Sequence, residues 1–167
     1  AAMGYAIPGS VIAVGVFMPL GQLDNIIDSW MQDNLGISTG LIFSGTIIAE
    51  AVEPGWPRAL ADRISDPCIN GKLLEEYRQG RVVPTSDIYA TNYSPEHLQL
   101  LKRLEVKANL VVPIVAGEQL LGLLIAHQCS RTKVWEQQEI NFLQRLAAQV
   151  GLSLTALSLV AQKAGEA

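Results

Sequence analysis

Cysteine, aromatic residues and charge of either sign are all scarce in this sequence, and the shortages exclude several functions. The two cysteines, Cys68 and Cys129, lie far apart and match no zinc spacing. Charged residues make up 17% of the 167 residues, the formal net charge is −4, and no basic cluster occurs. Because phosphate binding needs concentrated lysine and arginine, nucleic acid is not expected as a partner.

Long apolar runs are missing as well. The strongest one, residues 11–18, is broken by Gly15, is stopped by Pro19 and is too short to cross a membrane. It also lacks the basic start of a signal peptide, so we expect a cytoplasmic protein whose two thiols are free. No membrane contact is expected, and a buried strand is the interpretation favoured for this run.

Apolar residues make up 49% of the chain, which predicts one packed domain with its own core. We expect the folded domain to span 22–161, preceded by a tail or extra strand over 1–21 and followed by a tail over 162–167. An amphipathic helix over 22–35 and two short strands around Ser44-Gly45 begin it. A short helical run over 58–64 and a polar helix over 71–79 follow.

The central stretch combines polar side chains with clear element boundaries. Asp87-Ile88-Tyr89 ends an extended run, and Ser94-Pro95-Glu96 predicts a helix start with Ser as N-cap and Pro at the first helical position. His97 lies in that first turn. Two apolar runs, 108–116 and 120–126, then predict an antiparallel hairpin that ends at His127. Two histidines therefore flank one sheet-and-helix unit.

Catalytic patterns are absent. Cys68, Asp87, His97 and His127 include nucleophilic and basic groups, but no Gly-rich elbow follows a strand, no carboxylates are usefully paired, and no metal motif occurs. The sequence is therefore not expected to encode an enzyme.

A last helix is expected over about 134–161. Its apolar positions approach heptad spacing, and the helix is more apolar than one monomer needs, especially after Gly151. Two interpretations stay open: the helix covers its own sheet, or it also pairs with a second copy. We expect a homodimer through terminal helices.

The order of these motifs resembles the GAF domain of phytochromes and, more closely, of cyanobacteriochromes, the bilin-binding photoreceptors of cyanobacteria. The resemblance spans roughly residues 50 to 157. It rests on EPGWP (53–57), DPC (66–68), EYRQGRV (76–82), DIY (87–89), SPEHLQLL (94–101), KANLVVPI (107–114), LLGLLIAHQCS (120–130) and WEQQEI (135–140).

The resemblance implies an α/β sandwich of the GAF type. Its central antiparallel sheet has about six strands, with helices from both termini on one face and a ligand cleft on the other. It also implies a sensory module of a cyanobacterial signalling protein that binds a linear tetrapyrrole such as phycocyanobilin. A downstream histidine kinase or chemotaxis module is the implied output domain.

Site residues follow from the same resemblance. Asp87 matches the position whose carboxylate and backbone accept pyrrole N–H groups, and His97 matches the histidine that packs against the inner rings. His127 resembles the residue near the outer ring, while Tyr89 and Tyr93 are candidates for the pocket wall. Such a set suits a planar tetrapyrrole, which needs apolar walls, aromatic stacking and a few oriented polar groups.

One departure concerns covalent attachment. Glu96 stands where the family usually has its chromophore-attaching cysteine, and a carboxylate forms no thioether. Cys68 lies in an Asp-x-Cys motif similar to one that bears a second bilin-reactive cysteine in some cyanobacteriochromes, although Ile69 replaces the Phe of that motif. Attachment through Cys68, a bilin held without a covalent bond, and a bilin-free domain used for dimerisation and signal relay all stay open. A GAF domain for another small molecule, such as a cyclic nucleotide, lacks supporting residues.

Overall fold

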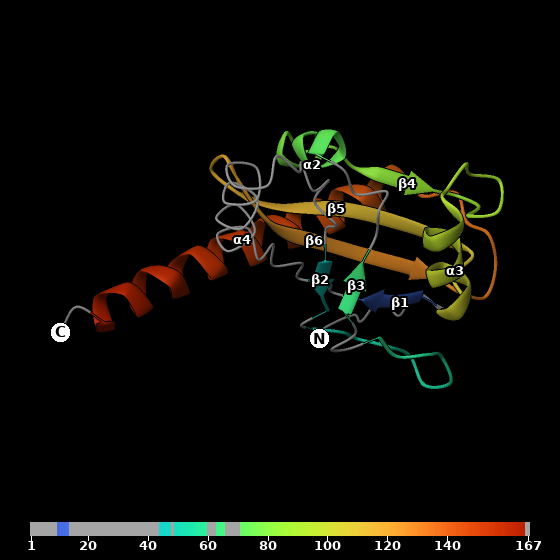
Figure 1. Cartoon of the computed structure of the whole chain (residues 1–167), viewed down its shortest axis with the longest axis horizontal. Helices are drawn as coiled ribbons and strands as arrows, with labels where there is room; N and C mark the ends of the chain where they lie inside the picture. The colour runs from blue at the N-terminus through green and yellow to red at the C-terminus, as the bar shows by residue number, and fades with distance from the viewer. Residues whose placement is uncertain (1–9, 14–43, 48, 60–62, 66–70, 166–167) are drawn as a thin grey trace, which may run out of the picture.

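A four-stranded antiparallel sheet forms the centre of the molecule (Figure 1). The computed structural model describes residues 10–13, 44–47, 49–59, 63–65 and 71–165. The central sheet has the order β1-β6-β5-β4, with β1 Ser10–Ala13, β4 Val83–Thr85, β5 Ala108–Ala116 and β6 Gln119–Gln128. A two-stranded sheet pairs β2 Ser44–Thr46 with β3 Arg63–Ser65. The helices of the described residues are α2 Gly71–Arg78, α3 Pro95–Arg103 and α4 Gln137–Gly165.

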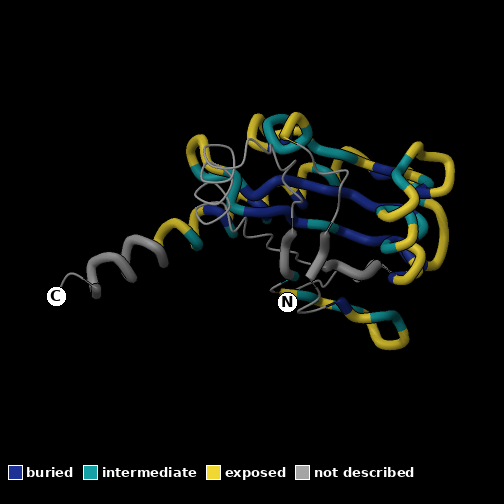
Figure 2. The backbone as a smooth tube through the Cα atoms, viewed as in Figure 1, coloured by how far each residue is buried: buried dark blue, intermediate teal, exposed yellow. Residues whose placement is uncertain are grey.

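The β5-β6 hairpin forms the middle of the central sheet. Its strands are almost wholly apolar and pair without interruption until a register shift between Ile114 and Val115. Gly117, at φ 60°, makes the tight turn between them, a backbone conformation that suits glycine. Continuous apolar runs are typical of strands covered on both faces, and Figure 2 shows both strands buried along most of their length.

Successive side chains of this hairpin point to opposite faces, so each face has its own core. The face toward α4 packs nine buried residues: Ala108, Leu110, Val112, Ile114, Leu124, Ala126, Trp135, Leu143 and Ala147. The opposite face carries two smaller clusters, one under α2 around Tyr77 and Leu123, and one under α3 around Ile88 and Val106. The site described below lies on this second face.

Helix α4 lies close against the sheet at Gly151. A Cβ atom there would lie 2.9 Å from the carbonyl oxygen of Val115, so a side chain would force the helix away from β5. Beyond this point α4 extends past the sheet (Figure 1), and Leu152 is 67% exposed. The helix begins at Gln137 rather than 134, because the Glu139 carboxylate accepts a hydrogen bond from the Glu136 N–H at 3.0 Å and fixes the N-terminus there.

Several sequence predictions are confirmed: the hairpin, the polar helix α2 and the start of α3. The extra-strand interpretation of the N-terminal run agrees with β1, which pairs with β6. The helix predicted over 22–35 lies outside the described residues.

Two local predictions are wrong. Ser44-Gly45 is not a turn between strands but part of β2, and Arg63 and Ile64, the end of the predicted helical run, belong to β3. The pairing between these distant segments decides both outcomes, because tertiary contacts override weak local propensity. The single sheet of about six strands is not confirmed, since the described strands divide into four and two.

Candidate functional site

The segment after β4 is fixed by one buried side chain between two polar ones. Ile88 is fully buried, and its N–H donates to the Lys107 carbonyl at 3.0 Å. The Asp87 carboxylate accepts a hydrogen bond from the Tyr89 N–H at 2.9 Å, and the Thr91 hydroxyl donates to the Asp87 carbonyl at 3.0 Å. The backbone turn therefore orients Asp87 while leaving its second carboxylate oxygen for another donor.

Helix α3 presents His97 from its first turn. The Ser94 hydroxyl accepts a hydrogen bond from the His97 N–H at 3.2 Å, as expected for an N-cap, and Pro95 begins the helix. The Tyr93 ring lies 4.5 Å from the His97 ring, centroid to centroid, at a tilt of 50°. The Tyr93 and Thr85 hydroxyls are 2.7 Å apart, so β4 holds the tyrosine that packs on the histidine.

Thr85 also joins the site to the other face of the sheet. The Trp135 indole N–H donates to the Thr85 carbonyl at 3.2 Å, in the chain just before α4. A single residue of β4 therefore contacts Tyr93 through its side chain and Trp135 through its backbone. Thr85 therefore links Tyr93 to the segment just before α4.

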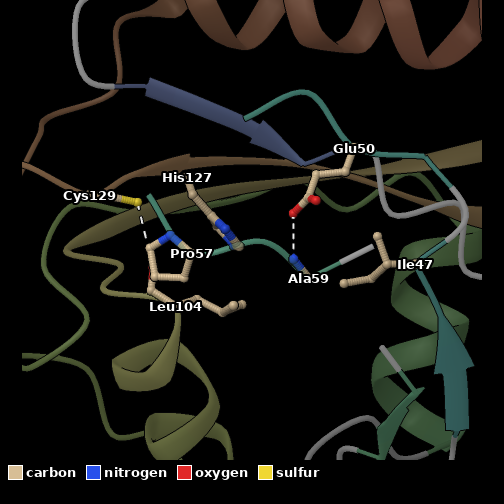
Figure 3. A pocket seen from close by; sticks show the side chains of 7 residues that line it. All are labelled: Ile47, Glu50, Pro57, Ala59, Leu104, His127 and Cys129. Carbon is tan, nitrogen blue, oxygen red and sulfur yellow. Dashed lines mark hydrogen bonds between the residues drawn. The ribbon is translucent and has the colours of Figure 1, made fainter. Parts of the chain in front are cut away.

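His127 lines a small cavity on the face opposite α4 (Figure 3). The cavity has a volume of about 20 Å³, and its walls also include Ile47, Glu50, Pro57, Ala59, Leu104 and Cys129. The Glu50 carboxylate accepts a hydrogen bond from the Ala59 N–H at 2.7 Å. A cavity of this size holds about one water molecule, so a larger ligand extends beyond it.

Burial, and secondarily the electrostatic interaction with His97, lowers the pKa of His127 to about 4. His127 is therefore neutral at physiological pH and offers one N–H donor and one acceptor nitrogen. His97 of α3 therefore lies within electrostatic range of His127 of β6, although thirty residues separate them in sequence.

The lowered pKa predicts a pH-dependent stability. Between pH 4 and the unfolded value near 6.5, the unfolded chain binds a proton that native His127 does not, so stability falls as pH falls through this window. The contribution is on the order of 3 kcal/mol. Urea unfolding between pH 4 and 7 should therefore show a shallower pH dependence in His127→Gln than in the unaltered domain. The matched variant His97→Gln should keep most of the slope, and equal slopes in all three would contradict the assignment.

The structure describes one of the two cysteines, Cys129. Cys129 is buried, its thiol donates to the Leu104 carbonyl at 3.7 Å, and burial raises its pKa to about 11. A thiol of this kind is a poor nucleophile, because the thiolate is the reactive form. Cys68 lies outside the described residues.

Tyr89 lies half exposed at the surface, with the Lys102 and Lys107 ammonium groups 5.7 and 5.4 Å from its ring centroid. Such positions give cation–π contacts. Glu96 is exposed on the first turn of α3. Tyr89 thus packs under lysines rather than against the histidines.

Among the predicted residues, Tyr93 and His97 are in ring contact, His127 lines the cavity, and Asp87 follows β4 in the chain. Sequence reasoning missed Glu50, Thr85 and Asn109. The signal for the last two was available, because each is a polar residue within an apolar strand.

No helix in the described part of the chain is long and apolar enough to span a bilayer.

The chain belongs to the GAF domain family, whose model matches residues 14–154. Within this family it is similar to cyanobacteriochromes. The blue-light absorbing form of the Thermosynechococcus elongatus PixJ GAF domain superposes with a TM-score of 0.69 at 35% identity, covering 88% of this chain and 95% of that one. PixJ is described as a cyanobacteriochrome.

Two further relatives extend the comparison. The far-red absorbing dark state of JSC1_58120g3, solved with bound biliverdin IXa, has a TM-score of 0.60 at 25% identity, covering 76% of this chain and 84% of that one. A Synechocystis protein named as a methyl-accepting chemotaxis protein is 49% identical over 121 residues, 72% of this chain. The aligned region is only 12% of that protein's length.

Proposed function

We propose that this chain is the light-sensing GAF domain of a cyanobacterial signalling protein and that it binds a linear tetrapyrrole such as phycocyanobilin. The observation that carries the proposal is the group of polar and aromatic side chains on the sheet face opposite α4, where buried His127 lines a cavity and the Tyr93 ring lies 4.5 Å from the His97 ring. The proposed role is that of a cytoplasmic sensor without catalysis.

The donor and acceptor groups of this face suit a bilin. Asp87 supplies a carboxylate for pyrrole N–H groups, His97 and Tyr93 supply aromatic contact, and His127 supplies one donor and one acceptor. When bound, the bilin supplies a conjugated system that absorbs light and isomerises about a double bond. Because the described cavity holds only about one water molecule, the ligand lies along the sheet from His127 towards β4 rather than inside that cavity alone.

Co-expression with bilin-synthesis enzymes tests the proposal. The purified domain is expected to carry a visible absorption band that protein expressed without those enzymes lacks. The matched control is the double variant Asp87→Ala/His97→Ala, which should take up much less pigment while keeping the same melting temperature. A colourless domain under both conditions would contradict bilin binding and favour the bilin-free relay function.

We further propose that two copies pair through α4. Phe142 and Leu152 are both exposed, so apolar surface remains for a partner helix. Paired helices of this kind would transmit a change at the site to a kinase or chemotaxis output domain. The similarity to a chemotaxis protein favours that arrangement.

Sedimentation at micromolar concentration tests the dimer. The unaltered domain is expected to sediment as a homodimer, and Leu152→Lys should shift it towards monomer because a charge cannot be buried unpaired at the interface. Val134→Lys is the matched control, since Val134 is also exposed but precedes the helix. A clean monomer of the unaltered domain at high concentration would contradict this proposal.

A further inference from the structure

A row of buried polar side chains crosses three strands of the central sheet. The register places Thr85 of β4 opposite Asn109 of β5, and Asn109 opposite His127 of β6. The exposed fractions of Thr85, Asn109 and His127 are 6%, 3% and 8%, respectively. Directly opposed residues share a face and have Cβ atoms about 4.5–5.5 Å apart. The three therefore form a continuous polar row across an otherwise apolar surface.

The two ends of this row belong to the site, but its middle has no assigned role. Thr85 holds Tyr93 through its hydroxyl, and His127 lines the cavity and interacts electrostatically with His97. The side-chain oxygen of Asn109 is buried and has no hydrogen-bond partner within the described ranges. Asn109 thus lies between the β4 residue that supports Tyr93 and the histidine of β6.

An orphaned acceptor at this depth calls for an explanation. Nearly all buried polar side-chain atoms in native proteins have a partner, and leaving one unpaired destabilises the fold. An apolar residue of similar volume would avoid that cost, since the neighbouring positions of β5 are apolar. In the described structure the Asn109 oxygen therefore contributes no hydrogen bond to the stability of the ligand-free domain.

We propose that Asn109 is a ligand-contacting residue and that its Oδ1 accepts a hydrogen bond from a ring N–H of the bound tetrapyrrole. This inference rests on the proposed function and adds a residue to its site. It also fixes the placement of the ligand, which must cross β5 between His127 and Tyr93 for a ring N–H to reach this oxygen.

The hydrogen bonds already made in and beside this row favour an N–H donor as the ligand group. The Thr85 hydroxyl is already engaged with Tyr93, and the Asp87 carboxylate is partly engaged by a backbone N–H. Asn109 offers an uncharged acceptor, which binds a donor without placing a further charge on a buried apolar surface. A ligand without N–H groups would leave this oxygen unpaired.

A purely structural role makes the opposite prediction. If the Asn109 oxygen instead accepts a hydrogen bond from the His127 ring in solution, its removal would destabilise the ligand-free domain and leave ligand affinity unchanged. Stability and affinity therefore separate the two roles.

The test replaces Asn109 with leucine and measures both quantities. Phycocyanobilin titrated into the purified Asn109→Leu domain is expected to bind about threefold to tenfold more weakly than to the unaltered domain, the loss typical of one hydrogen bond. Its absorption band should also shift. Without bilin, the melting temperature should stay the same or rise by roughly 2–4 °C, because the orphaned acceptor is gone. Asn109→Ala gives the affinity comparison without added bulk.

Gln128→Leu is the matched control. Gln128 is equally buried and adjacent to His127, but it lies on the opposite face and its side chain donates to the Ser130 hydroxyl at 2.8 Å. Its replacement should lower the melting temperature and leave bilin affinity unchanged.

The outcomes are distinguishable. Unchanged affinity in both Asn109 variants, with uptake by the unaltered domain, overturns this inference alone. A lower melting temperature with unchanged affinity assigns Asn109 to the His127 ring. No uptake by the unaltered domain overturns the bilin contact together with the proposed function.

Discussion

Replacing Cys68 by alanine is expected to abolish covalent attachment of bilin completely. Glu96 occupies the usual attachment position and cannot form a thioether, so the reaction requires one of the two thiols. In that reaction the sulfur adds to a carbon of the bilin side-chain double bond, the π bond breaks, and the thiol proton passes to the adjacent carbon. No oxidant is needed, and the thiolate is the attacking species.

Cys129 is the poor candidate of the pair. With a pKa of about 11, roughly one thiol in a thousand is ionised at pH 8, and its hydrogen bond to Leu104 keeps it within the core. The measurement is zinc-dependent fluorescence of denatured protein on a gel after co-expression with bilin-synthesis enzymes. The unaltered domain and Cys129→Ala should both fluoresce, whereas Cys68→Ala should not. A band that persists in Cys68→Ala and disappears in Cys129→Ala would show that the assignment is wrong.

Replacing Asp87 or His97 by alanine is expected to lower bilin affinity by about tenfold to a hundredfold. Under the proposed function each change removes a hydrogen-bonding group that would face the ligand, and a bond to a charged group contributes on the order of 1.5–3 kcal/mol. Neither side chain belongs to a buried apolar cluster, so the fold should be retained. Titration with phycocyanobilin gives the affinity, and the absorption maximum of each complex should shift.

A stability control separates ligand contact from fold support. Tyr93→Phe removes the hydroxyl paired with Thr85 but keeps the aromatic ring against His97, so it should change the spectrum less than His97→Ala. Thermal unfolding without bilin should be similar in the alanine variants and the unaltered domain. Lower melting temperatures with unchanged affinity would show that Asp87 and His97 serve the fold instead.

The hairpin and α3 were predictable because their signals are local. Two apolar runs on either side of Gly117 predict the hairpin turn, and Ser94 with Pro95 predicts the helix start. The pairing of β2 with β3 was not predictable, because it joins segments about twenty residues apart whose own propensities are weak. The close approach at Gly151 was equally hidden, since only the packed helix shows the Val115 carbonyl beneath it.

Part of the site followed from the sequence, and part required the fold. Resemblance alone placed Asp87, His97 and His127 together, and in the structure His97 is close enough to His127 to lower its pKa. The partner of Tyr93 and the orphaned oxygen of Asn109 depend on the register of β4, β5 and β6. Strand register is set by tertiary packing, so a polar residue in an apolar run indicates only that such a position exists.

The light-minus-dark difference spectrum of the domain co-expressed with bilin-synthesis enzymes tests the central claim most directly. A light-sensing GAF domain predicts a band that decreases under light it absorbs while a second band appears, with recovery in the dark or under light of the second colour. The Asp87→Ala/His97→Ala domain should show a strongly reduced difference signal. A pigment band that illumination leaves unchanged, or no band at all, would contradict the account.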